Sequence, residues 1–115
     1  MAEEISPEAI MAFAVLQSKR SLQIEDVSRL FFEIRQKGLE EVEKVALRRV
    51  PGGFYSDDVE AFFGRLLAAG FATARSPITV LENGKALCKA ILEKERELHP
   101  AALEKVALTL GFDPL

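Results

Sequence analysis

The sequence predicts a mainly helical α+β domain that carries one short β-hairpin. Apolar residues recur at helical spacing in six segments, most of which have a capping residue at one end. Two short segments of β type, residues 71–75 and 78–81, follow one another with Ser76-Pro77 between them. The 115 residues suit a single domain with one core, since 49% of them are apolar and 29% are charged.

The N-terminal part of the chain carries signals for two helices. Ser6 suits an N-cap and Pro7 suits the first helical position, and the apolar run over residues 9–16 predicts a helix that is buried on most sides. Apolar residues then share one face over about residues 24–37. Gly38 is expected to end this second helix as its C′ residue.

Two further helices are expected in the middle of the chain. A third helix is expected over about residues 39–50, before Pro51-Gly52-Gly53 breaks the chain. Its inner side comprises Leu39, Val42, Val45 and Ala46. Ser56 is the expected N-cap of a fourth helix, which Gly70 ends. The amphipathic stripe of that helix comprises Val59, Phe62, Phe63, Leu66 and Leu67.

Two more helices follow the hairpin. The fifth is expected over about residues 84–98, and Pro100 marks the start of a sixth. The inward-facing residues predicted for the fifth helix are Leu87, Ala90, Ile91 and Leu98. The stripe of the sixth helix comprises Leu103, Val106, Ala107 and Leu110. Residues 1–115 are therefore expected to form one domain, with a core at about 22–92 and a helical extension at about 93–115.

Two motifs resemble the second half of winged-helix domains. Residues 66–72, Leu-Leu-Ala-Ala-Gly-Phe-Ala, resemble the exit of the recognition helix, and residues 80–87, Val-Leu-Glu-Asn-Gly-Lys-Ala-Leu, resemble the passage from the wing into the next helix. The entry Gly53-Phe54-Tyr55-Ser56 is similar to that of small bacterial and phage-associated winged-helix proteins of the YwgA-like kind. The resemblance implies a winged helix-turn-helix in which the fourth helix is the recognition helix and the hairpin is a short wing.

If the fourth helix reads DNA, its N-terminal half should face base edges in the major groove. That half presents Asp57, Asp58 and Glu60. Carboxylates can accept a hydrogen bond from cytosine, but their negative charge weakens the attraction of the protein to the DNA phosphates. Carboxylates in the first turn are also favoured by the positive end of the helix dipole, whether or not the helix binds DNA. Arg65 on this helix and Arg75 in the wing are the cations that could contact DNA.

A second arrangement lets the third helix read DNA. Residues 22–27 and 38–39 would then contribute the first two elements of a helix-turn-helix. Lys44 and Arg48 are four residues apart and would share one helical face, with Arg49 beside them. Cations near a helix C-terminus are also favoured by the dipole alone. The candidate nucleic-acid-binding residues are therefore Lys44, Arg48, Arg49, Arg65 and Arg75.

No set of residues in the sequence indicates catalysis, a metal site or a cofactor. His99 is the single histidine, and its place before Pro100 suits a helix end. Cys88 has apolar neighbours, which is typical of a buried structural thiol. No Cys/His set has the spacing of a metal site. We therefore expect neither an enzyme nor a bound cofactor.

The charge and composition of the chain limit which partners and which cellular location are expected. The formal net charge of −3 restricts nucleic-acid binding to a local patch, because small proteins that bind nucleic acid through charge carry a basic excess. No apolar run is long enough to span a membrane, and acidic residues precede the first apolar segment, so a secretory signal is not expected. One cysteine in the chain fits a reducing cytoplasm.

Two functions from different classes remain open. A dimeric DNA-binding transcription regulator is narrowly favoured by the winged-helix resemblance and by the basic cluster. A protein-interaction module, such as an adaptor, a phage accessory factor or an antitoxin-like partner, is favoured by the acidic charge and the acidic fourth helix. The stripe of the sixth helix either closes the core of the monomer or forms a two-fold dimer, which is the commonest oligomer, and the C-terminal helices are the expected homodimer surface.

Overall fold

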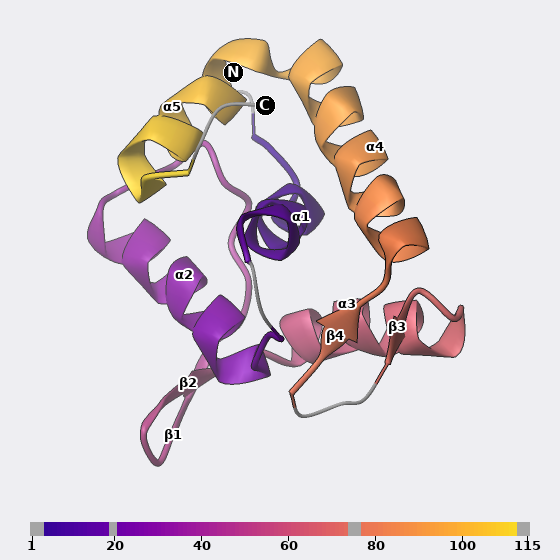
Figure 1. Ribbon diagram of the computed structural model, residues 1–115. Helices are drawn as coiled ribbons and strands as arrows, with labels where there is room; N and C mark the ends of the chain where they lie inside the picture. Colours follow the sequence, from indigo (N-terminus) through magenta and orange to yellow (C-terminus); the bar gives the residue numbers. More distant parts are fainter. Residues whose placement is uncertain (1–3, 19–20, 74–76, 113–115) are drawn as a thin grey trace.

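The helices of the protein surround the first helix, as the computed structural model of residues 4–18, 21–73 and 77–112 shows (Figure 1). The elements in chain order are α1 Pro7–Gln17, α2 Ile24–Gln36, β1 Arg48–Val50, β2 Gly53–Tyr55, α3 Asp57–Ala68, β3 Ala72–Thr73, β4 Thr79–Val80, α4 Glu82–Leu98 and α5 Pro100–Leu110. The strands form two separate antiparallel hairpins, β1–β2 and β3–β4. The prediction of a mainly helical α+β fold with a short hairpin is confirmed.

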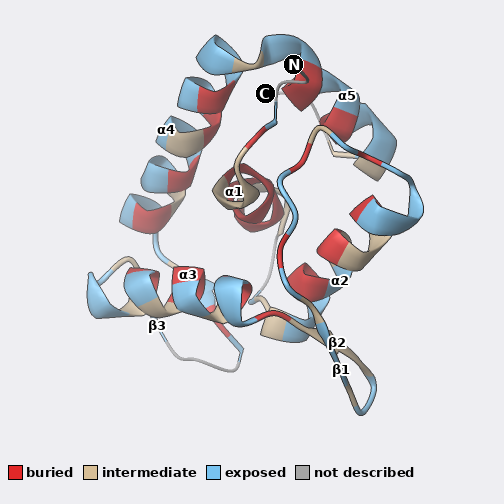
Figure 2. Ribbon diagram, turned by 180° about the vertical axis from the view of Figure 1, so that it is seen from behind, coloured by how far each residue is buried: buried red, intermediate tan, exposed pale blue. Residues whose placement is uncertain are grey.

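Helix α1 is the centre of the core. It is seen end-on in Figure 1, with the other four helices around it, and Figure 2 shows it buried. Every residue from Ala9 to Val15 is buried, as the apolar run predicted. Full burial of a side chain such as Ile10 stabilises the fold by about 1.5–3 kcal/mol, so the all-round apolar character of α1 is what makes a helix in this central position favourable.

Helix α5 closes the core at one end of α1. Its predicted stripe is largely confirmed, since Leu103, Val106 and Ala107 are buried within the monomer. The chain then turns at Gly111, and the ring of Phe112 stacks on that of Phe13 at a centroid distance of 5.0 Å. The apolar stripe of α5 is therefore covered by the same chain.

The predicted third helix does not form. Residues 39–47 contain turns, an isolated bridge and irregular backbone, and residues 48–50 belong to β1. Val42 forms a parallel bridge with Ile5. The amide of Ile5 donates to the carbonyl of Glu41 at 2.7 Å, and the amide of Glu43 donates to the carbonyl of Ile5 at 3.1 Å. These hydrogen bonds with a distant segment replace the bonds that a helix would make with itself.

The segment that was expected to break the chain is instead the turn of the β1–β2 hairpin. Arg48 pairs with Tyr55 and Val50 pairs with Gly53, which leaves Pro51-Gly52 as a two-residue turn. Gly52 has a φ of 88°, and proline followed by a residue with positive φ is the arrangement of a type II turn. The expectation of a single hairpin was therefore incomplete.

The predicted hairpin is present as β3–β4. Ala72 pairs with Val80, and a bridge between Leu22 and Ile78 joins this hairpin to the start of α2. The expected strands at 71–75 and 78–81 are thus confirmed in their central parts. Arg75 lies outside the described residues.

The buried face of α4 differs from the predicted one. Leu98 is 55% exposed and Leu87 is 37% exposed, although both were expected to point inward. The buried residues of α4 are Gly84, Cys88, Leu92 and Glu95. At Gly84 a Cβ atom would lie 2.4 Å from the carbonyl oxygen of Phe71, so the absence of a side chain allows α4 to start directly against the preceding segment.

Glu95 of α4 is buried and holds the start of α1. One of its carboxylate oxygens, Oε1, accepts hydrogen bonds from the amide of Ser6 at 3.1 Å and from the hydroxyl of Ser6 at 2.7 Å. Ser6 is the N-cap residue of α1, but its side chain does not cap the helix. These two hydrogen bonds satisfy one oxygen of the buried carboxylate, whereas its Oε2 is buried without a hydrogen-bond partner among the described residues.

Candidate interaction surface

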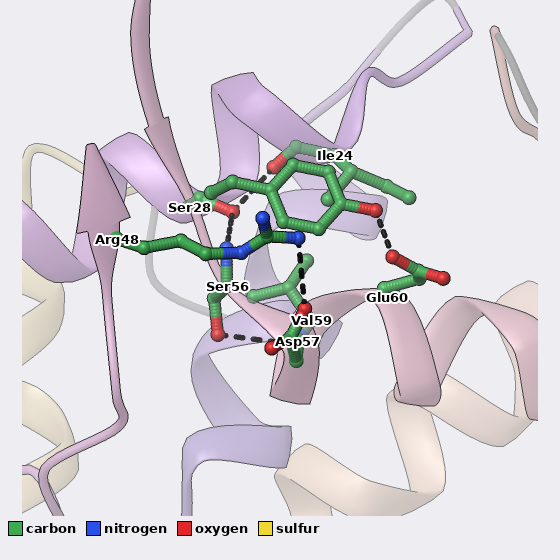
Figure 3. A network of polar contacts seen from close by, with 8 residues as sticks. Ile24, Ser28, Arg48, Ser56, Asp57, Val59 and Glu60 are labelled. Atoms are coloured by element: carbon green, nitrogen blue, oxygen red, sulfur yellow. Dashed lines mark hydrogen bonds and ion pairs between the residues drawn. The ribbon is translucent and has the colours of Figure 1, made fainter. Parts of the chain in front are cut away.

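A buried pair of serines joins α2 to the start of α3 (Figure 3). The hydroxyl of Ser28 donates to the carbonyl of Ile24 at 2.7 Å and accepts a hydrogen bond from the amide of Ser56 at 3.0 Å. The hydroxyl of Ser56 in turn accepts from the amide of Val59 at 3.3 Å, which confirms Ser56 as the N-cap of α3. Both serines are fully buried, so the end of the β1–β2 hairpin is held where it runs into α3.

Two aromatic residues of β2 hold the hairpin against the helices. The ring of Phe54 stacks on that of Phe32 from α2, with centroids 4.1 Å apart. The hydroxyl of Tyr55 donates a hydrogen bond to the carboxylate of Glu60 on α3. This bond, together with partial burial, raises the pKa of Tyr55 to about 12. The hairpin is thus fixed from both of its faces, since neighbouring residues of a strand point to opposite sides.

Arg48 and Arg49 lie on β1, over the two aromatic rings of β2. The guanidinium of Arg48 is 4.7 Å from the centroid of the Tyr55 ring and 3.2 Å from Oδ1 of Asp57. The guanidinium of Arg49 is 5.8 Å from the centroid of the Phe54 ring. The Arg48–Asp57 pair is exposed, and such pairs contribute roughly 0–1 kcal/mol. The two arginines therefore belong to different faces of the hairpin.

The prediction that a third helix would read DNA with Lys44, Arg48 and Arg49 is therefore wrong. Residues 39–50 are not helical, because they pair with Ile5 and then form β1, so the four-residue spacing of Lys44 and Arg48 does not place them on one face.

Lys44 instead lies at the same pocket as Arg65 of α3. Both residues line a pocket of about 260 Å³, together with three carboxylates, from Glu8, Glu43 and Asp58. Neither of the hairpin arginines lines this pocket. The sequence candidates are thus divided between two places, Lys44 with Arg65 and Arg48 with Arg49, and mixed charge surrounds the first pair.

The exposed side of α3 is acidic at its start. Asp57 and Asp58 are exposed in the first turn, and Glu60 is half-buried against Tyr55. Asp57 is engaged by Arg48, so part of this charge is neutralised within the chain. The remaining carboxylates suit the positive end of the helix dipole, as expected.

Arg29 belongs to the same surface, although the sequence did not single it out. Its guanidinium lies 3.7 Å from the position that a Cβ atom on Gly53 would occupy, so α2 brings a third arginine to the hairpin. In the described part of the chain neither Arg29 nor Arg49 forms an ion pair with an acid. The turn signal Pro51-Gly52 between Arg-Arg-Val and Gly-Phe-Tyr could have revealed the hairpin. We call the exposed side chains of the β1–β2 hairpin, with Arg29, the hairpin surface.

The single cysteine and the single histidine lie where they support the fold. Cys88 is fully buried, and burial raises the pKa of its thiol to about 11, which keeps it protonated at neutral pH. His99 lies between α4 and α5 and is half-buried. Among the residues that the structure describes, no group of three or more His, Cys, Asp or Glu side chains is placed to hold a metal ion. Within the same residues, no helix combines the length and the apolar character needed to cross a membrane.

Comparison with known proteins does not assign the chain to a family. No protein-family model matches it, and neither a curated protein nor a solved structure matches it. The winged-helix resemblance therefore stays a prediction, and its function has to be argued from the surface itself.

Proposed function

We propose that this chain is a cytoplasmic protein-interaction module that binds a partner protein through the hairpin surface. The observation that carries the proposal is a hairpin that is held by contacts of Phe54 and Tyr55 and extends beyond the helices in both views (Figures 1 and 2). β2 packs against α2, whereas β1 makes no extensive contact with any described element other than β2. A loop held in one conformation before binding loses less entropy when a partner docks, and this favours affinity.

The composition of the hairpin surface supports a protein partner. Arginine and aromatic residues are enriched at the centres of protein interfaces, and Arg49 lies over Phe54 while Arg48 lies over Tyr55. Of the three arginines of the hairpin surface, Arg48 is paired with Asp57, whereas Arg29 and Arg49 form no ion pair with an acid among the described residues. The partner that we propose therefore carries carboxylates opposite these two arginines.

The charges near the hairpin are too few for strong binding to a duplex. Two phosphate contacts, one for each of Arg29 and Arg49, give a salt slope near −2, which means about a tenfold loss of affinity between 50 and 200 mM salt. Proteins that make roughly six to ten phosphate contacts lose about 10³–10⁵-fold over the same range. The exposed Asp57 and Asp58 on α3 would also face phosphates if that helix entered a groove.

Capture of a partner with matched variants tests the proposal. The purified chain, Arg49→Glu and Lys94→Glu are each used as bait in native lysate, with and without nuclease. Lys94 is an exposed cation on α4, so its variant changes the net charge equally but leaves the hairpin intact. We expect a protein that survives nuclease, is retained by Lys94→Glu and is lost with Arg49→Glu. Equal retention by both variants would exclude the hairpin as the docking site.

A DNA-binding regulator is the second candidate, because three arginines gather on one projecting hairpin. It is tested by the fluorescence anisotropy of a labelled duplex titrated with the chain at several salt concentrations. A salt slope steeper than about −4, lost when Arg48 and Arg49 are both changed to glutamate, would favour this candidate over the protein partner. No measurable binding at low salt would reject it.

A further inference from the structure

The outer side of α5 carries an exposed apolar side chain beside an apolar pocket. Leu108 is 70% exposed, more than any other large hydrophobic residue in the described part of the chain. It lines a pocket of about 320 Å³ that is formed by residues of α1, α4 and α5 and by Phe112. The lining residues are Phe13, Arg96, Pro100, Leu103, Glu104, Ala107, Leu108 and Phe112. We call this the α5 pocket.

Leu108 does not belong to the buried stripe of α5. Leu103, Val106 and Ala107 point into the core of the monomer, whereas Leu108 follows on the outer side, next to the exposed Glu104 and Lys105. An exposed leucine by itself is ordinary, but here it adjoins a hollow of mostly apolar lining.

The two charged residues of the α5 pocket have opposite signs and come from different helices. Arg96 lies in the last turn of α4, and Glu104 lies in α5. Both are exposed, and neither forms an ion pair within the described ranges of the chain. In a two-fold contact, residue i of one copy meets residue j of the other and j meets i, so a surface with an apolar centre, one cation and one anion can pair with a second copy of itself.

We propose that two copies of this chain pair through the α5 pocket. Leu108 of each copy enters the pocket of the other, and Arg96 of each copy faces Glu104 of the second copy. The exposed positions of one eleven-residue helix form a small contact compared with about 800 Å² per partner in a standard interface. The dimer is therefore expected to dissociate on dilution. This inference does not depend on the proposed function, because it uses no residue of the hairpin surface.

Sedimentation equilibrium of the purified chain, without any partner, tests the dimer. The average mass is expected to rise from 12.7 kDa toward twice that value as the concentration increases from about 5 to about 500 micromolar. Leu108→Glu should remain a monomer throughout. Leu98→Glu is the matched control, since Leu98 is 55% exposed but does not line the pocket, and it should dimerise as the parent chain does.

A charge reversal separates the proposed pairing from damage to the fold. Arg96→Glu alone should weaken the dimer at least tenfold, and adding Glu104→Arg should restore it, because the two signs are then exchanged. A parent chain that stays monomeric up to the highest concentration would overturn the inference. So would a Leu108→Glu variant that dimerises normally, and the pocket would then be free for a small apolar ligand or another protein.

Discussion

Changing Ser28 to alanine removes the hydroxyl that joins α2 to the start of α3. The amide of Ser56 then loses its acceptor, at 3.0 Å, inside a fully buried site. Leaving one buried donor unsatisfied costs about 1–3 kcal/mol. The bond that Ser28 donates to the carbonyl of Ile24 adds little, because a serine that bonds back to the preceding turn slightly destabilises its own helix. We therefore expect Ser28→Ala to lower the free energy of unfolding by about 2 kcal/mol.

Urea denaturation followed by circular dichroism measures this change. With a slope of about 1.5 kcal/mol per molar, a loss of about 2 kcal/mol lowers the midpoint by about 1.3 M at an unchanged slope. Ser21→Ala is the matched control, because Ser21 is exposed, and its free energy of unfolding should stay within about 0.5 kcal/mol of the parent value.

Hydrogen exchange supplies a local test of the same reasoning. The amide of Ser56 should exchange faster in Ser28→Ala, since its hydrogen bond is lost. A variant whose stability lies within about 0.5 kcal/mol of the parent chain, with the Ser56 amide still protected, would refute the argument that this bond holds the hairpin to α2.

Three further predictions concern single side chains. Gly84→Ala should lower the free energy of unfolding by about 2 kcal/mol in urea, because its Cβ would lie 2.4 Å from a backbone oxygen; a stabilised variant would contradict the close contact. Cys88 should resist a thiol reagent at pH 8 in the native state and react fully in denaturant, since burial raises its pKa to about 11; rapid native labelling would show that the thiol is accessible. Tyr55 should ionise near pH 12 in an ultraviolet titration, and Glu60→Gln should move its pKa toward 10.0, because the bond to the carboxylate favours the protonated phenol. The stabilisation from this bond is present below the unfolded pKa and lost as the pH rises through the folded one, so unchanged titration in Glu60→Gln would contradict the bond.

Helices with local boundary signals were predictable from the sequence. α3 has a serine N-cap, acids in the first turn and an apolar stripe, all within residues 56–70, and the structure confirms each of them. α1 and α5 start at prolines for the same local reason. These features depend on residues close together in the chain, so no knowledge of the tertiary fold was needed.

The segment before the hairpin could not be assigned by periodicity. Leu39, Val42 and Val45 recur every third residue and are all buried, which suits a helix as well as an irregular strand crossing the core. The bridge from Val42 to Ile5 decided between them, and the two residues are 37 positions apart in the chain. Because residues 48–50 form β1 instead of the end of a helix, two of the three residues of the predicted basic cluster, Arg48 and Arg49, lie on the hairpin.

The amino-acid sequence by itself determined the mainly helical class, the serine N-cap of α3, the apolar character of α1 and the proline starts of α1 and α5, because these follow from neighbouring residues. Only the tertiary structure decided which face of α4 is buried, where Glu95 finds the two donors of Ser6, and how Arg29 reaches the hairpin. Each of these depends on contacts between segments that are distant in the chain, and such contacts override local preferences. The surface that we propose as functional is built from such contacts, and the resemblance to winged-helix domains did not indicate it.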